Sequence, residues 1–269
     1  MIANILAIAG SDPSGGAGIQ ADIKAISAQG AYAMAVITAL TVQNTHGVEA
    51  VSLVAPDLVA AQIAAIRSDI RIDAVKIGML GDAAIIDAVT RALDGLAAPI
   101  VLDPVMVAKS GDRLLAERAV AALRERLLPR VHVLTPNLPE AADLLGVGEA
   151  GDIAAMAEQA RALMALGPAA VLLKGGHLAG EGSPDLLATR DGLTQLSGPR
   201  HLTGNTHGTG CTLSSAVAAL LGKGLPLADS AEAAKAYVGG AIAASSALSV
   251  GKGHGPTHHF HALWPAGSG

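Results

Sequence analysis

The chain has 269 residues, of which 51% are hydrophobic and 1% aromatic, so its length fits one large α/β domain or two small ones with an aliphatic core. The formal net charge is −5, and no run of Lys and Arg forms the basic stripe of a nucleic-acid-binding protein. The uncharged stretch at residues 236–250 is broken by two glycines and is too short for a membrane span.

The chain begins with an apolar run, residues 1–11, that lacks the basic region and cleavage site of a signal peptide. From there, short apolar runs alternate with segments of helical spacing. We expect buried strands at 5–9, 35–40, 74–77, 100–103, 131–134 and 170–174. We expect helices between them at 19–29, 58–68, 83–93, 117–127, 140–145 and 153–166.

This alternation predicts an α/β fold in which a mostly parallel sheet carries helices on both faces, as a single domain over residues 1–269. Asp191-Gly192 lies between two short strand-like runs, 186–189 and 193–196, and this arrangement predicts a β-hairpin. Two further helices are expected at 209–221 and 228–248.

Polar or glycine-rich residues follow each of the six expected parallel strands. They are Gly10-Ser11-Asp12, Gln43-Asn44, Gly78-Met79, Asp103-Pro104, Pro136-Asn137 and Lys174-Gly175-Gly176. Ligands of open α/β sheets bind beyond the carboxyl ends of the strands. The pattern therefore predicts one ligand site along that edge of the sheet.

The sharpest motif is Asn205-Thr206-His207-Gly208-Thr209-Gly210-Cys211, directly before a helical segment. Glycines at a helix start let backbone N–H groups approach a ligand, and the helix dipole favours negative charge there. A cysteine in the first turn is expected to have a lowered pKa. The alternative is a glycine-rich turn with an inert, buried Cys211. As the only cysteine, it also excludes an internal disulfide and favours a reducing, cytoplasmic location.

A second glycine loop, Gly10 to Gly18, opens another helix but matches neither familiar nucleotide motif. A Walker loop needs Gly-Lys followed by Ser or Thr, and neither Gly222-Lys223 nor Gly251-Lys252 has that. A dinucleotide fold needs an acidic residue roughly 20 positions further on, where this chain has Thr38-Ala39-Leu40. The loop by itself is equally typical of strand–helix packing.

Several charged residues near strand ends are suited to phosphate or metal chemistry. Lys174 is able to contact a phosphate as a point charge. Asp103 and Glu140 are able to hold Mg²⁺ directly or through water. Each of them, taken alone, is also typical of a solvated surface, and Asp22 is typical of a helix start. Four histidines near the end, 254, 258, 259 and 261, lack metal-ligand spacing and indicate a packed tail.

Eight stretches together resemble the hydroxymethylpyrimidine/phosphomethylpyrimidine kinases of thiamine biosynthesis, within the ribokinase-like superfamily. They are AGSDPSGGAGIQADIKA (9–25), VITALTVQNTHGV (36–48), DAVKIGML (73–80), VLDPVMVAKSGDRLL (101–115), LTPNLPEAADLL (134–145), LLKGGHL (172–178), NTHGTGCTLSSAVAALL (205–221) and GHGPTHHFHALW (253–264). The resemblance runs nearly from end to end, and QNTHGV with NTHGTGC is specific to this branch.

The resemblance implies a role for particular residues. The pyrimidine pocket would be lined by Gly10, Ala17, Asp22, Gln43, Met79 and Val105. The phosphates of Mg²⁺-bound ATP would be served by Asp103, Glu140, Asn137 and Thr209, with Lys174 at the transferring phosphate and Lys235 near the nucleotide. The anion hole would be formed by Gly208, Thr209, Gly210 and Cys211. The implied reaction phosphorylates a hydroxymethyl alcohol and then its monophosphate, and a homodimer is implied as well.

Other functions remain open at this point. Gln43 carries one acceptor and two donors, which match a ring nitrogen beside an exocyclic amine and therefore favour a pyrimidine over pyridoxal. A pyridoxal kinase of the same superfamily is the nearest alternative. A sugar kinase is disfavoured because the resemblance places Cys211 where sugar kinases carry an aspartate base. A nucleotide-binding regulator without activity would not need Cys211 and Lys174 together.

Overall fold

A computed structural model describes residues 1–106 and 117–264. The described residues form one nine-stranded sheet with the strand order β3-β2-β1-β4-β5-β6-β7-β8-β9. The strands are β1 (Asn4–Ser11), β2 (Tyr32–Asn44), β3 (Gly47–Leu53), β4 (Ala74–Ile77), β5 (Ile100–Leu102), β6 (Val133–Leu134), β7 (Ala170–Lys174), β8 (Asp185–Thr189) and β9 (Gly192–Leu196). The strands from β2 to β7 in this order pair in parallel, whereas β3, β8 and β9 are antiparallel at the two edges.

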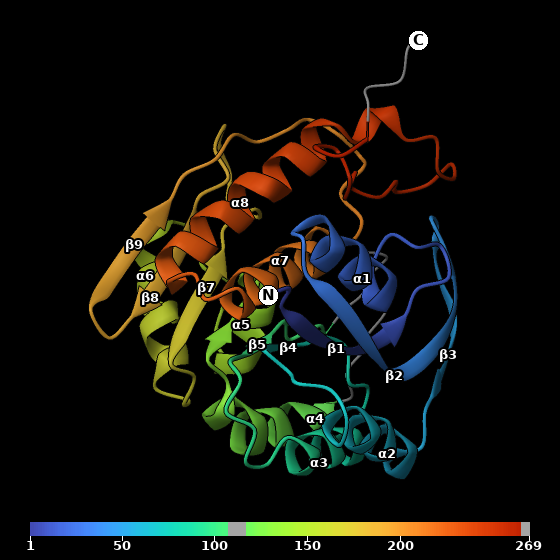
Figure 1. The fold of residues 1–269 in the computed structure, drawn as a ribbon. Coiled ribbons are helices and arrows are strands. Elements are labelled where there is room, and N and C mark those ends of the chain that lie inside the picture. Colours follow the sequence, from blue (N-terminus) through green and yellow to red (C-terminus); the bar gives the residue numbers. More distant parts are fainter. Residues whose placement is uncertain (107–116, 265–269) are drawn as a thin grey trace.

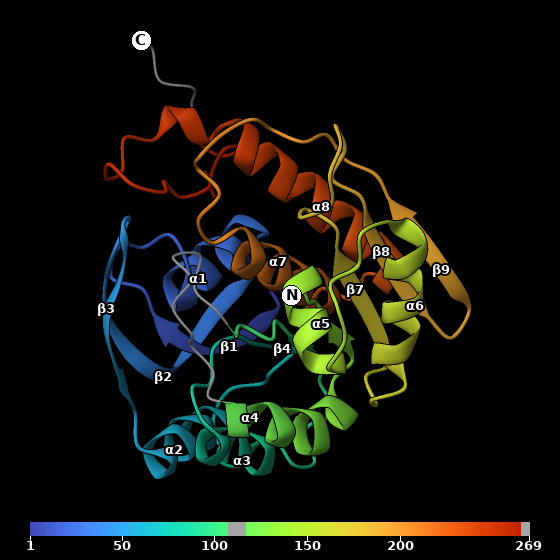
Figure 2. The ribbon, with the colours of Figure 1, turned by 180° about the vertical axis from the view of Figure 1, so that it is seen from behind.

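Helices cover both faces of the sheet, with α2, α3 and α4 gathered on one side of β1 and β2 and α1, α7 and α8 on the other (Figures 1 and 2). The helices are α1 (Gly18–Ala28), α2 (Pro56–Arg67), α3 (Ala83–Ala92), α4 (Glu117–Ala122), α5 (Leu138–Leu145), α6 (Ile153–Met164), α7 (Thr209–Gly222) and α8 (Leu227–Ala243). A π-helical turn at Leu123–Leu127 and a 3₁₀ turn at Leu128–Arg130 continue α4. The predicted α/β fold is confirmed.

The sheet separates two apolar cores, and the alternation of side chains along β1 shows why. Leu6 and Ile8 pack into the core under α2 to α6, while Ile5 and Ala7 pack into the core under α1, α7 and α8. Successive side chains of a strand point to opposite faces, so a strand covered on both sides is apolar at nearly every position. The continuous apolar runs in the sequence are the consequence.

The second strand differs from its expected form. It continues beyond residue 40 to Asn44, so Gln43 lies inside a strand and not after one. This extension pairs with β3, which the sequence did not reveal, with Gln43 opposite Val48 and Asn44 opposite Gly47. Most of β3 is exposed, and an edge strand with two solvated faces carries no buried apolar run to identify it.

The C-terminal segment packs back onto the molecule. His254 N donates a hydrogen bond at 2.8 Å to Thr45 O, which lies in the turn between β2 and β3. His258 N donates one at 2.9 Å to Ala241 O, which lies in α8. Near its end the rings of Phe260 and Trp264 stack with centroids 4.9 Å apart. The last expected helix, 228–248, is shorter than predicted because α8 ends at Ala243 and only a 3₁₀ turn follows, Ser245–Ala247.

Within the two described ranges, the structure contains no helix with the length and hydrophobicity that a membrane crossing requires. The part of the resembling stretch 101–115 beyond residue 106 lies outside the described residues.

Candidate active site

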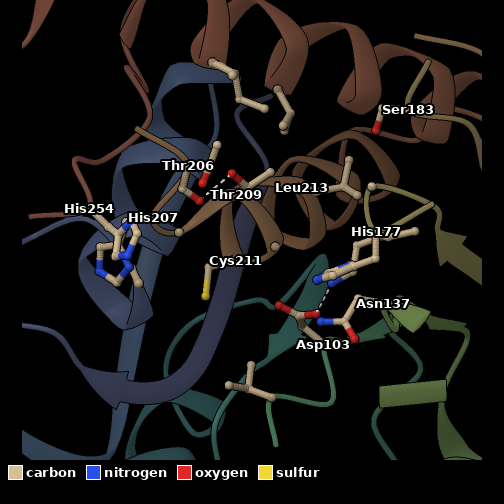
Figure 3. Close-up of a pocket in the computed structure, with 18 of the residues that line it drawn as sticks. Asp103, Asn137, His177, Ser183, Thr206, His207, Thr209, Cys211, Leu213 and His254 are labelled. Atoms are coloured by element: carbon tan, nitrogen blue, oxygen red, sulfur yellow. Dashed lines mark hydrogen bonds and ion pairs between the residues drawn. The ribbon is translucent and has the colours of Figure 1, made fainter. Parts of the chain in front are cut away.

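A large cavity opens along the carboxyl ends of the parallel strands, where the start of α7 meets the loops that follow the strands. Its volume is about 1790 Å³, larger than the roughly 300–1,000 Å³ of a typical single-ligand pocket. Figure 3 shows Thr209 and Cys211 from the start of α7, and Asp103 and Asn137 from strand ends, around this space. The cavity has room for two ligands.

Almost every position singled out from the sequence lines this cavity. On the side assigned to the acceptor these are Gly10, Ala17, Gln43, Met79 and Val105. On the side assigned to phosphate, nucleotide and metal they are Asp103, Asn137, Glu140, Lys174, Gly208, Thr209, Gly210, Cys211 and Lys235. Residues that are far apart in the sequence meet here because parallel strands end at one edge of the sheet.

Glycines allow the start of α7 to pack closely against the loop after β1 and against Lys174. Gly208 has φ of 78°, and a Cβ there would lie 1.8 Å from the carbonyl oxygen of Gly16, so only glycine is accommodated. A Cβ on Gly210 would lie 3.1 Å from Lys174 Nζ. No side chain caps the helix at Gly208. The positive end of the helix dipole therefore lies next to the Lys174 ammonium, and both favour an anion.

The thiol of Cys211 differs from its expected state. Burial raises its pKa to about 11, and although the charge of Lys76 lowers the pKa, the carboxylates of Asp22 and Asp103 raise it further. The expectation of a lowered pKa at the helix start is therefore wrong for this structure, since burial outweighs the dipole. Without ligands, Cys211 is a neutral thiol at neutral pH.

Lys174 connects two buried carboxylates at the centre of the cavity. Its Nζ lies 2.8 Å from Asp103 Oδ1 and 3.9 Å from Glu140 Oε2. Burial by itself lowers the pKa of Lys174, but the attraction of both carboxylates is larger, so the pKa is raised. Lys174 is therefore a permanent cation.

A capping box at the start of α5 orients Glu140 toward this lysine. Asn137 Oδ1 accepts from Glu140 N, and Glu140 Oε2 accepts from Asn137 N, each at 2.8 Å. Burial raises the pKa of Glu140 to about 7, against the opposing effect of Lys174. The position of Glu140 is thus determined by the helix start as well as by the ion pair.

A second buried ion pair lies beneath the cavity, and no local sequence pattern predicts it. Lys76 Nζ donates to both carboxylate oxygens of Asp22, at 2.7 and 2.9 Å, and Ser215 Oγ donates to Asp22 at 2.8 Å. The side chains of Lys76 and Asp22 are 0% exposed, and only Lys76 is among the residues that line the cavity. The structure thus places Asp22 behind the expected pocket wall, where it neutralises Lys76.

Replacing Lys76 with methionine should reduce the free energy of unfolding by about 3–5 kcal/mol, because Asp22 would remain buried without its counter-ion. Adding Asp22→Asn should restore most of that loss, since an amide is far cheaper to bury than a lone carboxylate. Urea unfolding of both variants measures the effect. A Lys76→Met variant with the same free energy of unfolding as the unsubstituted protein would contradict this prediction.

Two other assigned side chains already have partners. Lys235 Nζ donates to Asp185 Oδ2 and to Ser183 O, each at 2.7 Å. Gln43 Oε1 accepts from Thr41 Oγ1 at 3.2 Å. Lys235 is therefore anchored to the strand beside it, and the amide oxygen of Gln43 is already paired within its own strand.

The histidine-rich end packs against α7 and α8, as expected. His258 and His259 are 8% and 4% exposed, and His259 Nε2 lies 3.0 Å from Thr212 Oγ1. Burial lowers the pKa of His259 to about 4, so its ring is neutral. Over residues 1–106 and 117–264, no three His, Cys, Asp or Glu side chains are grouped to hold a metal.

Two further residues line the cavity although sequence reasoning assigned them no role. They are Asp12, in the loop after β1, and His207, in the loop before α7. His207 Nε2 lies 2.7 Å from Asp12 Oδ2. Both belong to motifs that the sequence singled out, but 195 positions separate them, and no local pattern reveals that they pair.

Comparisons with known proteins identify the family to which this chain is similar. A family model described as phosphomethylpyrimidine kinase matches residues 12–258. The chain is 55% identical over 262 residues to the hydroxymethylpyrimidine/phosphomethylpyrimidine kinase of Escherichia coli (strain K12), covering 97% of this chain and 98% of that protein.

Solved structures of both a pyridoxal kinase and a phosphomethylpyrimidine kinase share this fold. A Bacillus subtilis pyridoxal kinase, solved as an ADP complex, has a TM-score of 0.90 at 36% identity and covers 97% of this chain and 99% of that one. A phosphomethylpyrimidine kinase from Clostridium difficile 630 has a TM-score of 0.78 at 40% identity and covers 88% of this chain and 98% of that one.

Proposed function

The chain belongs to the phosphomethylpyrimidine kinase family, and on that premise we propose that it is an ATP-dependent kinase of thiamine biosynthesis. It phosphorylates 4-amino-5-hydroxymethyl-2-methylpyrimidine and then phosphorylates the resulting monophosphate to the pyrophosphate. The observation that carries this proposal is the meeting of Lys174, Asp103 and Glu140 with the uncapped start of α7 inside one two-ligand cavity.

Phosphoryl transfer depends on charge neutralisation and in-line positioning more than on covalent help. In our proposal the amides of residues 208–211 and the ammonium of Lys174 surround the migrating γ-phosphoryl group. ATP lies on the side of Asn137, Thr209 and Lys235. The pyrimidine lies on the side of Gly10, Ala17, Gln43, Met79 and Val105, so that its hydroxymethyl oxygen faces Cys211.

Asp103 and Glu140 fit a magnesium ion. Mg²⁺ is usually held by one or two carboxylates together with waters and substrate phosphates, and not by a full protein cage. Two buried carboxylates that both lie within 3.9 Å of Lys174 Nζ, without a third ligand beside them among the described residues, match that pattern. When bound, Mg²⁺ would neutralise phosphate charge, and Lys174 would share that task.

We also propose a cytoplasmic homodimer. The lone cysteine supports a reducing compartment. The exposed apolar side chains Leu40 and Val42, which share one face of β2, support a partner surface at this sheet edge. Light scattering in solution would give the mass of the assembly, and a monomer at all concentrations would refute the dimer.

The experiment that tests the function is product analysis by mass. The protein is mixed with Mg²⁺, ATP and the hydroxymethylpyrimidine, and samples are taken over time. We expect the monophosphate to appear first and the pyrophosphate after it. The absence of both products would refute the proposal.

Similarity to a pyridoxal kinase keeps pyridoxal phosphorylation as the second candidate, and Gln43 separates the two substrates. An aminopyrimidine presents a ring nitrogen beside an amine, which an amide matches with one donor and one acceptor, whereas pyridoxal lacks that edge. Gln43→Met should therefore lower kcat/KM for the pyrimidine by about 10–100-fold, the loss expected for one or two hydrogen bonds.

The control for Gln43→Met is the same variant assayed with pyridoxal, because the two alcohols share the phosphate machinery. We expect its kcat/KM for pyridoxal to change less than threefold. Similar losses with both alcohols would contradict a specificity role for Gln43.

A further inference from the structure

The cavity contains a hydrogen-bonded pair, the carboxylate of Asp12 and the imidazole of His207, that joins its two glycine loops and that the proposed chemistry does not use. Asp12 accepts four hydrogen bonds. Oδ1 accepts from Ser14 N at 2.9 Å and Ser14 Oγ at 2.7 Å, and Oδ2 accepts from Ala17 N at 2.8 Å. The fourth donor is His207 Nε2, 2.7 Å from Oδ2, and Figure 3 shows His207 on the wall of the cavity beside the start of α7.

The pair is buried and its carboxylate is ionised. The side chains of Asp12 and His207 are 3% and 12% exposed. Burial alone would raise the pKa of Asp12, but hydrogen bonds from His207, Ser14 and the Ala17 amide outweigh it and hold the pKa below its usual value. An ionised carboxylate only accepts, so Nε2 of His207 is the donor.

Glycines let the two loops approach until their backbones touch. A Cβ on Gly16 would lie 2.4 Å from His207 Cδ2, and a Cβ on Gly208 would lie 1.8 Å from Gly16 O. This steric contact limits how closely the two loops approach, but it does not fix the orientation of one loop relative to the other. The hydrogen bond from His207 to Asp12 supplies that directional constraint.

The far side of His207 is held by the C-terminal segment. His207 N donates a hydrogen bond to Gly255 O at 3.0 Å, and Thr257 N donates one to His207 O at 3.3 Å. Lys24 Nζ in turn donates to Gly15 O at 2.7 Å and supports the first loop from α1. Both ends of the bond are therefore attached to structure outside the two loops.

We propose that the Asp12–His207 pair is a positioning element for phosphoryl transfer, which fixes the distance between the acceptor and the phosphate being transferred. This rests on the proposed function. The loop of Asp12 joins the end of β1, which carries Gly10, to Ala17, both on the acceptor side, and the loop of His207 leads directly into Gly208 to Cys211 on the donor side. Reacting atoms must lie about 3–3.5 Å apart and in line, and a misplacement of about 1 Å is able to cost 10²-fold in rate.

A positioning role has a kinetic signature that differs from a chemical one. His207→Phe keeps a ring against Gly16 but removes the donor. We expect it to lower kcat about 10–100-fold for the alcohol and by the same factor for the monophosphate, because the geometry serves both steps. The KM for ATP and for each acceptor should change less than threefold, since each ligand keeps its own contacts.

His207→Gln is the conservative variant, because its amide is able to place an N–H where Nε2 lies. It should recover kcat to within about threefold of the unsubstituted enzyme. Ser14→Ala removes one bond that orients Asp12 without touching His207, and it should lower kcat for both acceptors by a smaller common factor of about 2–5. It serves as the test if the Phe variant does not fold, as judged by its melting temperature.

Three results would overturn the proposal. One is a His207→Phe or Ser14→Ala enzyme with unchanged kcat, and another is a loss confined to one acceptor. The third is a His207→Gln enzyme as slow as His207→Phe. If the unsubstituted protein phosphorylates neither acceptor, the proposed function fails, whereas normal turnover with unaffected variants refutes the positioning role alone.

Discussion

Replacing Cys211 with alanine should slow phosphorylation of the alcohol by about 10²–10⁴-fold, the usual contribution of a general base. Phosphorylation of the monophosphate should fall far less, because a phosphate oxygen is already anionic and needs no base. Separate assays of ADP release with each acceptor measure the two rates. Equal losses in both would show that Cys211 acts in binding or in the shape of the helix start.

The pH dependence tests the same role independently. Because burial raises the pKa of Cys211 to about 11, the deprotonated fraction rises about tenfold for each pH unit below that value. The rate of the alcohol step should therefore rise with pH between about 7 and 9, and this rise should be absent in Cys211→Ala. A flat profile in the unsubstituted enzyme would contradict a thiolate base.

Replacing Lys174 with methionine should lower kcat by about 10²–10³-fold for both acceptors, the cost expected when one preorganised electrostatic group is lost. Lys174 is a permanent cation beside the start of α7, and both steps move the same γ-phosphoryl group. The variant also leaves Asp103 and Glu140 without their cation, which increases the negative charge that the incoming phosphates meet. Steady-state kinetics with saturating Mg²⁺ and ATP measure the loss.

Lys235→Met provides a matched control. Lys235 and Lys174 are both 14% exposed, and each lies within 2.8 Å of a buried aspartate, but our proposal assigns Lys235 to the nucleotide side of the cavity. We expect Lys235→Met to raise the KM for ATP with kcat within about fivefold. Equal losses of kcat in both variants would show that breaking a buried ion pair, and not loss of phosphate stabilisation, is the cause.

The ribokinase-like α/β fold was predictable because its signal is local. Strands such as β1, β4 and β7 are covered on both faces and therefore read as short apolar runs. The helix starts at Asn137 and Asp152 carry residues that cap the first turn. By contrast β3 was not predicted, since it is held by pairing with the extended part of β2 and has no buried face of its own.

The site was predictable where strand ends determine it and unpredictable where side chains pair across the fold. The topology alone brings Lys174, Asp103 and the start of α7 to one edge. The partner of Asp22 is Lys76, 54 positions away, within a strand whose other residues are apolar. The pKa of Cys211 could not be predicted either, because it depends on burial by segments distant in the sequence.

The tryptophan that stacks on Phe260 lies in the C-terminal segment, so the enzyme's indole fluorescence is a local signal. The chain contains one tryptophan, and it is attached to the segment whose backbone holds the loop before α7. Emission excited near 295 nm (a wavelength selective for indole) therefore reports on the surroundings of this C-terminal segment, while the two aliphatic cores remain spectroscopically silent. Ligand titrations and denaturation curves followed by this emission describe the C-terminal segment first and the sheet only indirectly.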